Sequence, residues 1–326
     1  MTDLASVPSL RPDPGSFRDP RSRVYVDDHE VVRLLDEQGA AEFEALEASR
    51  FFARAQADGR LVRTWRRPLP AGVDERWRVA LSHERIPVVS YPYEWSFSML
   101  QDAALLQLEL VGEALRCGLT SKDGSAYNLQ FAGGRPVFID IGSFQPVGAD
   151  PWPGHRQFGE LFLHPLLIEA HLGVAFAPLL RGSLDGIPAS TASALLRGTA
   201  RFKRGVLTNV TARALVADRL ADRDDPAGAV LGDAAHGTEV MAAVVRKTSD
   251  LVRHLATRRR ETAWTGYQDR SHYVDDSLAV KDAVVRAAIG RPARARWSTS
   301  AATTAATPGW PLARDGRWWR WTPTAR

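Results

Sequence analysis

Cysteine is nearly absent from this chain of 326 residues, which carries only Cys117. A single cysteine excludes an intramolecular disulfide and any cysteine-rich metal site. Because Cys117 follows an apolar stretch, we expect it to be a buried or half-buried small hydrophobic residue at a helix end. The sequence also lacks a signal-peptide pattern and any uninterrupted apolar segment of membrane-span length. We therefore expect a cytoplasmic protein without a membrane partner.

Lysine is equally scarce, with four residues against 38 arginines. No lysine precedes Lys122, and no G-x-G-x-x-G run occurs in the N-terminal part. These absences exclude the usual phosphate-holding lysine and glycine-rich loop of a protein kinase. The net charge of +4 is modest, so the basic pI does not by itself indicate nucleic acid, and we consider a nucleic-acid partner unlikely.

The segment from Ser121 to Phe144 carries the strongest chemical pattern. Asp123 is followed by Asn128 and, beyond an alternating run around Gly133-Gly134, by Asp140. That run, LQFAGGRPVFI, predicts a β-hairpin. The order matches a kinase catalytic loop followed by its metal-binding aspartate. Phosphoryl transfer needs a carboxylate base, here Asp123, and hard oxygen ligands for Mg²⁺, here Asn128 and Asp140.

A kinase-like fold follows as the expectation. We predict an α+β, bilobal, protein-kinase-like architecture with a small β-rich N-lobe, a mostly helical C-lobe and an irregular C-terminal tail. Mg-ATP is the cofactor that such a site would use, and Arg63 or Arg78 could replace the missing lysine as a point charge. The plain alternative is that Asp123 and Asn128 cap a loop while Asp140 braces a turn.

Aromatic residues precede the predicted helix that leads to this loop. Tyr93, Glu94 and Trp95 would occupy the hinge between two lobes and could stack a nucleotide base. Core packing of these aromatic side chains is the competing interpretation, and it is the more common one.

The pattern along the rest of the chain divides it into four parts. We expect residues 1–16 to be disordered, 17–235 to form the kinase-like module, 236–290 to form a helical connector and 291–326 to form an aberrant tail. Within the module, two short strands flank Asp27-Asp28, and a single helix runs to Gly59.

Several of these blocks resemble a bacterial family of class I SAM-dependent methyltransferases, of a type that includes nodulation proteins. The matching segments are Ser90–Ser98, Asp102–Leu106, Lys122–Phe131 and Gly134–Phe144, and weaker matches continue so that the resemblance covers roughly residues 17 to 290. The resemblance implies a SAM-binding Rossmann-like domain after this module and a small-molecule substrate that the sequence does not identify.

The tail departs from that family. After residue 290 the chain is rich in tryptophan and arginine and has no glycine-rich turn after a strand, so we expect no SAM site in this chain. A shifted reading frame could encode the missing strand, glycine turn and acidic residue, which makes a frameshifted, truncated product our interpretation. A genuine Trp/Arg-rich extension is the alternative.

These readings leave three functions. The first is a truncated methyltransferase-family protein that retains the kinase-like module and is non-catalytic alone. The second is a Mg-ATP-dependent small-molecule phosphotransferase with Asp123 as base. The third is a binding module that presents a substrate to a partner domain.

Overall fold

The computed structural model describes residues 11–16, 19–26, 30–148, 152–212, 234–257 and 275–289. It divides into two compact units, Met1–Arg258 and Arg259–Arg326. The first contains every element discussed below except the helix α10 (Asp275–Ile289), which belongs to the second. The unit boundary falls within residues 236–290, which the sequence analysis treats as a connector. The predicted tail at 291–326 lies outside the described residues.

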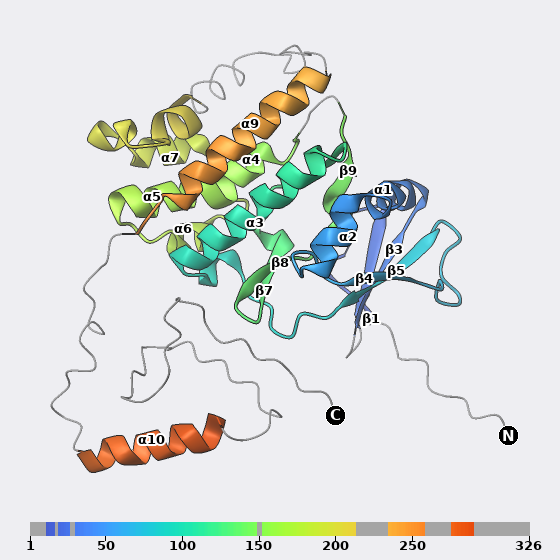
Figure 1. Ribbon diagram of the computed structural model, residues 1–326, viewed down its shortest axis with the longest axis horizontal. Coiled ribbons are helices and arrows are strands. Elements are labelled where there is room, and N and C mark those ends of the chain that lie inside the picture. The colour runs from blue at the N-terminus through green and yellow to red at the C-terminus, as the bar shows by residue number, and fades with distance from the viewer. Residues whose placement is uncertain are drawn as a thin grey trace. The chain divides into compact units, whose positions relative to one another are not determined.

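The N-terminal part of the first unit is an antiparallel sheet in the order β1-β2-β3-β5-β4 (Figure 1). Its strands are β1 (Arg11–Pro12), β2 (Ser22–Val26), β3 (Glu30–Leu35), β4 (Thr64–Arg67) and β5 (Val79–Glu84). The prediction of two strands around Asp27-Asp28 is confirmed by β2 and β3, whereas the turn itself lies outside the described residues. Residues 11–16 fall in the range expected to be disordered, yet they include β1, which pairs with β2.

The side chains of β3 alternate between two environments, as the period of a strand requires. Val32 and Leu34 pack with Trp77 and Ala80 on one face of the sheet. Leu35 joins the main core on the other face, together with Leu81 and residues of the helices. Arg33 shares the parity of Leu35, so an arginine side chain lies on the face directed toward the main core.

Two helices, α1 (Glu37–Glu47) and α2 (Arg50–Ala57), connect β3 to β4. The sequence predicted one helix here, and that prediction is wrong. Ser49 accepts a hydrogen bond on its Oγ from Phe52 N and thereby starts a second helix. Gly59, with a φ of 75°, ends the pair as expected.

A long buried helix, α3 (Phe97–Leu115), follows the sheet and leads into two short strand pairings. β6 (Leu119–Ser121) pairs with β9 (Phe144–Pro146), and β7 (Leu129–Ala132) pairs with β8 (Arg135–Phe138). The predicted hairpin is confirmed, because Gly133 and Gly134 both adopt positive φ angles in its turn.

Cys117 is exposed, so its predicted burial is wrong. The apolar face of α3 ends at Leu115, and Cys117 belongs to the turn that precedes Gly118.

The remaining part of the unit is helical. Its helices are α4 (His155–Phe158), α5 (His164–Leu172), α6 (Ala177–Gly182), α7 (Ala189–Leu195) and α9 (Ala234–Arg253), with π-helical segments at Gly159–Leu163 and Leu207–Thr211 and a 3₁₀ segment at Gly198–Phe202. In Figure 1, α9 lies alongside α3. The mixed α and β composition with an N-terminal antiparallel sheet agrees with the expected α+β class, and the kinase-like two-lobed arrangement stays a prediction. No helix in the described parts of the chain has both the length and the apolar character needed to cross a lipid bilayer.

Candidate functional site

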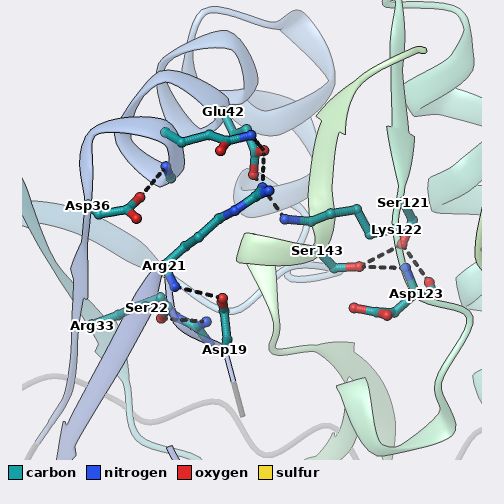
Figure 2. Close-up of polar contacts among 12 residues, drawn as sticks. Asp19, Arg21, Ser22, Arg33, Asp36, Glu42, Ser121, Lys122, Asp123 and Ser143 are labelled. Atoms are coloured by element: carbon teal, nitrogen blue, oxygen red, sulfur yellow. Dashed lines mark hydrogen bonds and ion pairs between the residues drawn. The ribbon is translucent and has the colours of Figure 1, made fainter. Parts of the chain in front are cut away.

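Strand β6 ends in the loop that carries Asp123, and two serines fix the backbone of that loop (Figure 2). Ser121 donates a hydrogen bond from Oγ to the carbonyl of Asp123 at 2.6 Å, and its Oγ lies 2.8 Å from Oγ of Ser143. Asp123 N donates to Ser143 Oγ at 3.3 Å, and Lys122 N donates to Ser143 O at 2.7 Å. The loop is therefore tied to the residues that follow Asp140.

Close backbone packing holds the same loop from the other side. A Cβ atom on Gly124 would lie 2.2 Å from the carbonyl oxygen of Gly154, and one on Gly154 would lie 2.4 Å from Asp123 C. Gly124 N also donates to Gln157 Oε1 at 3.0 Å. Only glycine allows this approach, which fixes the loop against the start of α4.

Asn128 and Asp140 lie at two short 3₁₀ turns on either side of the hairpin. Asn128 ends a 3₁₀ turn, Ala126–Asn128, and its carbonyl accepts a hydrogen bond from Ile139 N at 2.8 Å. Asp140 begins a second 3₁₀ turn, Ile141–Ser143, and its carbonyl accepts from Ser143 N at 3.0 Å. Ser143, at the end of the second turn, also bonds the main chain of Lys122 and Asp123 and so ties this turn to the Asp123 loop.

The surroundings of Asp123 shift the pKa of its carboxyl group. Burial raises its pKa, and the negative charge of Asp140 raises it further, while the charge of Lys122 partly opposes both effects. The two carboxylates are therefore close enough to repel each other, which favours a cation or a proton between them.

Arg33 is a cationic residue at this site that sequence patterns did not reveal. Its Nη2 lies 2.9 Å from Oδ1 of Asp140, an ion pair whose geometry leaves that oxygen without a hydrogen bond among the described residues. Arg63 and Arg78, the arginines suggested from sequence, lie elsewhere: Arg63 lines a separate hollow with Trp65 and Glu84, and Arg78 donates to the carbonyl of Glu75. The sequence feature that could have revealed Arg33 is its position in β3, where alternation places it on the same face as the core residue Leu35.

A second ion-pair cluster borders the site and centres on Glu42 of α1. Figure 2 shows Arg21 and Lys122 reaching this carboxylate, and each nitrogen–oxygen distance is 2.9 Å. The side chain of Glu42 is 14% exposed. Because Arg21 precedes β2 and Lys122 follows β6, the cluster joins the sheet, α1 and the Asp123 loop.

Between these groups lies a narrow pocket with room of about 20 Å³ for the centre of a water-sized group. Its charged lining comes from Asp19, Arg21, Arg33, Glu42 and Lys122. Sites for organic ligands usually measure about 300 Å³ or more. A nucleotide would therefore enter only if side chains such as Arg33 moved.

The three predicted hinge residues have separate roles in the structure. Trp95 is 3% exposed, packs on Phe131 and donates from Nε1 to Ser90 Oγ at 2.9 Å, so its indole is part of the core. Glu94 accepts the main-chain hydrogen bond of Tyr91 at 2.8 Å and caps its own turn. Tyr93 is half-buried and stacks on Tyr91. Trp95 is not available to stack a base, and core packing explains it.

The side chains of Asn128 and Asp140 can be compared with the ligands that Mg²⁺ requires. Among the described residues no three His, Cys, Asp or Glu side chains form a metal-binding group. Mg²⁺ is commonly held by one or two protein carboxylates together with the phosphates of its ligand. Asp140 Oδ1 lacks a hydrogen bond, and so does the buried Nδ2 of Asn128 within the described chain. Asp140 Oδ1 is an acceptor that a cation could use together with phosphate oxygens, whereas Asn128 Nδ2 is a donor that suits a phosphate oxygen and cannot bind the cation; an all-protein cage does not fit the described residues.

Comparison with known proteins shows similarity to a nodulation protein. The chain is 37% identical over 182 residues to nodulation protein NoeA of Rhizobium meliloti (strain 1021). The aligned region covers 54% of this chain and 37% of NoeA, so the chain corresponds to little more than a third of that protein. No protein-family model matches the chain.

Proposed function

We propose that residues 17–235 form a kinase-like module that binds a divalent cation together with a phosphate-bearing ligand such as ATP. The module is non-catalytic by itself and serves a longer protein of the SAM-dependent methyltransferase type. The observation that carries the proposal is the approach of Asp140 to Asp123 and of Arg33 to Asp140, with Asn128 at the base of the hairpin that leads to Asp140.

The order of elements supports the kinase-like part. An antiparallel sheet with α1 after its third strand precedes a long helix, a loop with Asp123 and Asn128, a hairpin and Asp140. A kinase site uses this order of loop and metal-binding aspartate. The similarity to NoeA over part of its length supports the idea that such a module also occurs within a longer chain.

In this proposal Asn128 and Asp140 hold the cation through their oxygen atoms. A bound Mg²⁺ would neutralise phosphate charge and fix the ligand's orientation. Arg33 supplies a positive charge from β3, where a kinase would use lysine. An arginine presents several donors in a planar fork, so it suits phosphate oxygens by geometry as well as by charge.

A second candidate function is phosphoryl transfer to a small molecule, with Asp123 as the base. The raised pKa of Asp123 favours it, because a carboxyl group held above its ordinary pKa is a better proton acceptor near neutral pH. Asp123 would then accept the proton of a substrate hydroxyl.

Thermal-shift measurements test the proposal directly. We expect Mg-ATP to raise the melting temperature of the wild-type protein and to have no effect on an Asp140→Asn variant. Asp250→Asn, which changes a surface carboxylate of α9 that is 63% exposed, is the matched control and should retain the shift. SAM should give no shift. Absence of any Mg-ATP effect on the wild type would refute the proposal, and ATP hydrolysis lost in Asp123→Asn would favour the second candidate.

A further inference from the structure

Arg33 is poorly satisfied for a largely buried arginine. Its side chain is 16% exposed, and its guanidinium group carries five N–H donors. Within the described chain, Nε is buried without a hydrogen-bond partner, and Nη1 reaches only Ser22 Oγ, at 3.4 Å. Buried donors are usually paired, so an arginine left in this state points to a partner that is not part of the protein.

The guanidinium group also covers one oxygen of Asp140, because Nη2 lies 2.9 Å from Oδ1. It lies over Gly142, where a Cβ atom would come within 3.2 Å of Nη1, and it forms part of the wall of the narrow pocket. The positive charge of Arg33 lies next to Asp140, the carboxylate that would hold the cation in the proposed function. Arg33 and a cation therefore compete for Asp140 by simple electrostatics.

We propose that Arg33 exchanges partners when the site is filled. This inference rests on the proposed function. Without ligand, Arg33 pairs with Asp140 and keeps a lone divalent cation out. When cation and phosphate arrive together, Arg33 leaves Asp140 and pairs with a phosphate oxygen. The exchange makes the site selective for the cation–phosphate complex over either component alone, and no bond is made or broken in the ligand.

Removal of the Arg33 charge should change the affinities for the free cation and for the cation–ATP complex in opposite directions. Mn²⁺ is a suitable paramagnetic probe, because the same oxygen ligands bind Mg²⁺ and Mn²⁺. In Arg33→Gln we expect the affinity for Mn²⁺ alone to rise by about tenfold, since a neighbouring cation commonly disfavours a second positive charge at a carboxylate by this factor or more. The affinity for Mn-ATP should fall by about tenfold, because a charged hydrogen-bond partner of the phosphate is lost.

Electron paramagnetic resonance of free Mn²⁺ measures the first affinity, and calorimetry with Mn-ATP measures the second. Asp140→Asn breaks the same ion pair from the other side and should weaken both. If breaking the pair only loosened the fold, the two variants would behave alike, and this result would overturn the exchange. Arg78→Gln is the control for the change of arginine to glutamine, and it should alter neither affinity.

The outcomes separate this inference from the function on which it rests. Failure of the wild type and of Arg33→Gln to bind Mn²⁺ or Mn-ATP would remove the proposed function. Binding of Mn-ATP by the wild type, with loss in Asp140→Asn but no tighter Mn²⁺ binding in Arg33→Gln, would remove the exchange and leave the function standing. Tighter Mn²⁺ binding with weaker Mn-ATP binding in Arg33→Gln supports both.

Discussion

Two arginines connect separate elements of this protein through carboxylates, and they differ in how completely they are satisfied. Arg60 makes two hydrogen bonds to Glu113, at 2.9 and 3.1 Å, and one each to Glu109 and Asp58 at 2.9 Å. Burial lowers the pKa of Arg60, but the hydrogen bonds and charges of Asp58 and Glu113 outweigh it and hold that pKa above its usual value. Arg60 therefore fastens the segment after α2 to α3.

Arg33 has a similar exposure to Arg60 but one long hydrogen bond and one ion pair. Burial and the charge of Arg33 lower the pKa of His83 to about 3, so the histidine beside Arg33 on the sheet stays neutral and adds no second positive charge. The comparison suggests that a saturated arginine serves the fold, whereas an unsaturated one is kept for a ligand. Three substitutions test this contrast.

The largest effect should come from Arg60→Gln. This change leaves the carboxylate of Glu113, which is 12% exposed, without its bidentate partner. We expect a loss of about 2 kcal/mol in the free energy of unfolding, measured by urea denaturation. Mn-ATP affinity should be unchanged. A stability equal to wild type would contradict the structural role assigned to Arg60.

A smaller effect, of opposite sign, should follow from Asp123→Asn. Burial and Asp140 raise the pKa of Asp123 in the folded state, so the protonated form favours folding and ionisation opposes it. The stabilising contribution is present below the unfolded-state pKa and is lost as pH rises through the folded-state pKa. The amide should therefore raise the free energy of unfolding at pH 7, by less than about 1 kcal/mol because water screens this partly exposed group, and add little near pH 3.

Comparison of urea midpoints at the two pH values measures this difference. A gain that was the same at both pH values would show that ionisation of Asp123 is not its cause.

The smallest effect should be that of Arg33→Gln on stability. Its partner Asp140 is 26% exposed and keeps access to water, so we expect a loss of about 0.5 kcal/mol or less by urea denaturation. The ratio of the stability losses in Arg60→Gln and Arg33→Gln measures most directly how differently the two arginines serve the fold. Equal losses from the two variants would mean that Arg33 also serves mainly the fold.

The sequence predicted those parts of the fold that depend on local signals. The alternation around Gly133-Gly134 and the end of α3 before Gly118 both agree with the structure, because backbone conformation at glycine is a local property. The division of one predicted helix into α1 and α2 was missed, since the cap at Ser49 competes with continuous apolar periodicity. The predicted domain limits, the frameshifted tail and the SAM domain remain predictions.

The site was predictable only in part for a related reason. The spacing of Asp123, Asn128 and Asp140 along a single loop and hairpin could be read from the chain. Arg33 and Glu42 come from β3 and α1, about 80 residues or more before Asp123, and only tertiary packing brings them near it. Trp95 illustrates the opposite error: its aromatic side chain suited a predicted ligand site, but in the structure it packs in the core.

Leu61 forms a parallel bridge with Phe138, and the neighbouring main-chain groups of Arg60 and Val62 bond to both the carbonyl and the amide of Phe138 at 2.9 Å. Residues 60–62, which belong to the N-terminal half, thus pair with the edge of the β7–β8 hairpin at Phe138. A fragment cut after β5 would leave these amides and the apolar side chains of α2 in contact with water, and such an unprotected edge invites aggregation. Expression of either half alone should therefore yield inclusion bodies, and useful truncations must keep residues 60–62 together with Phe138.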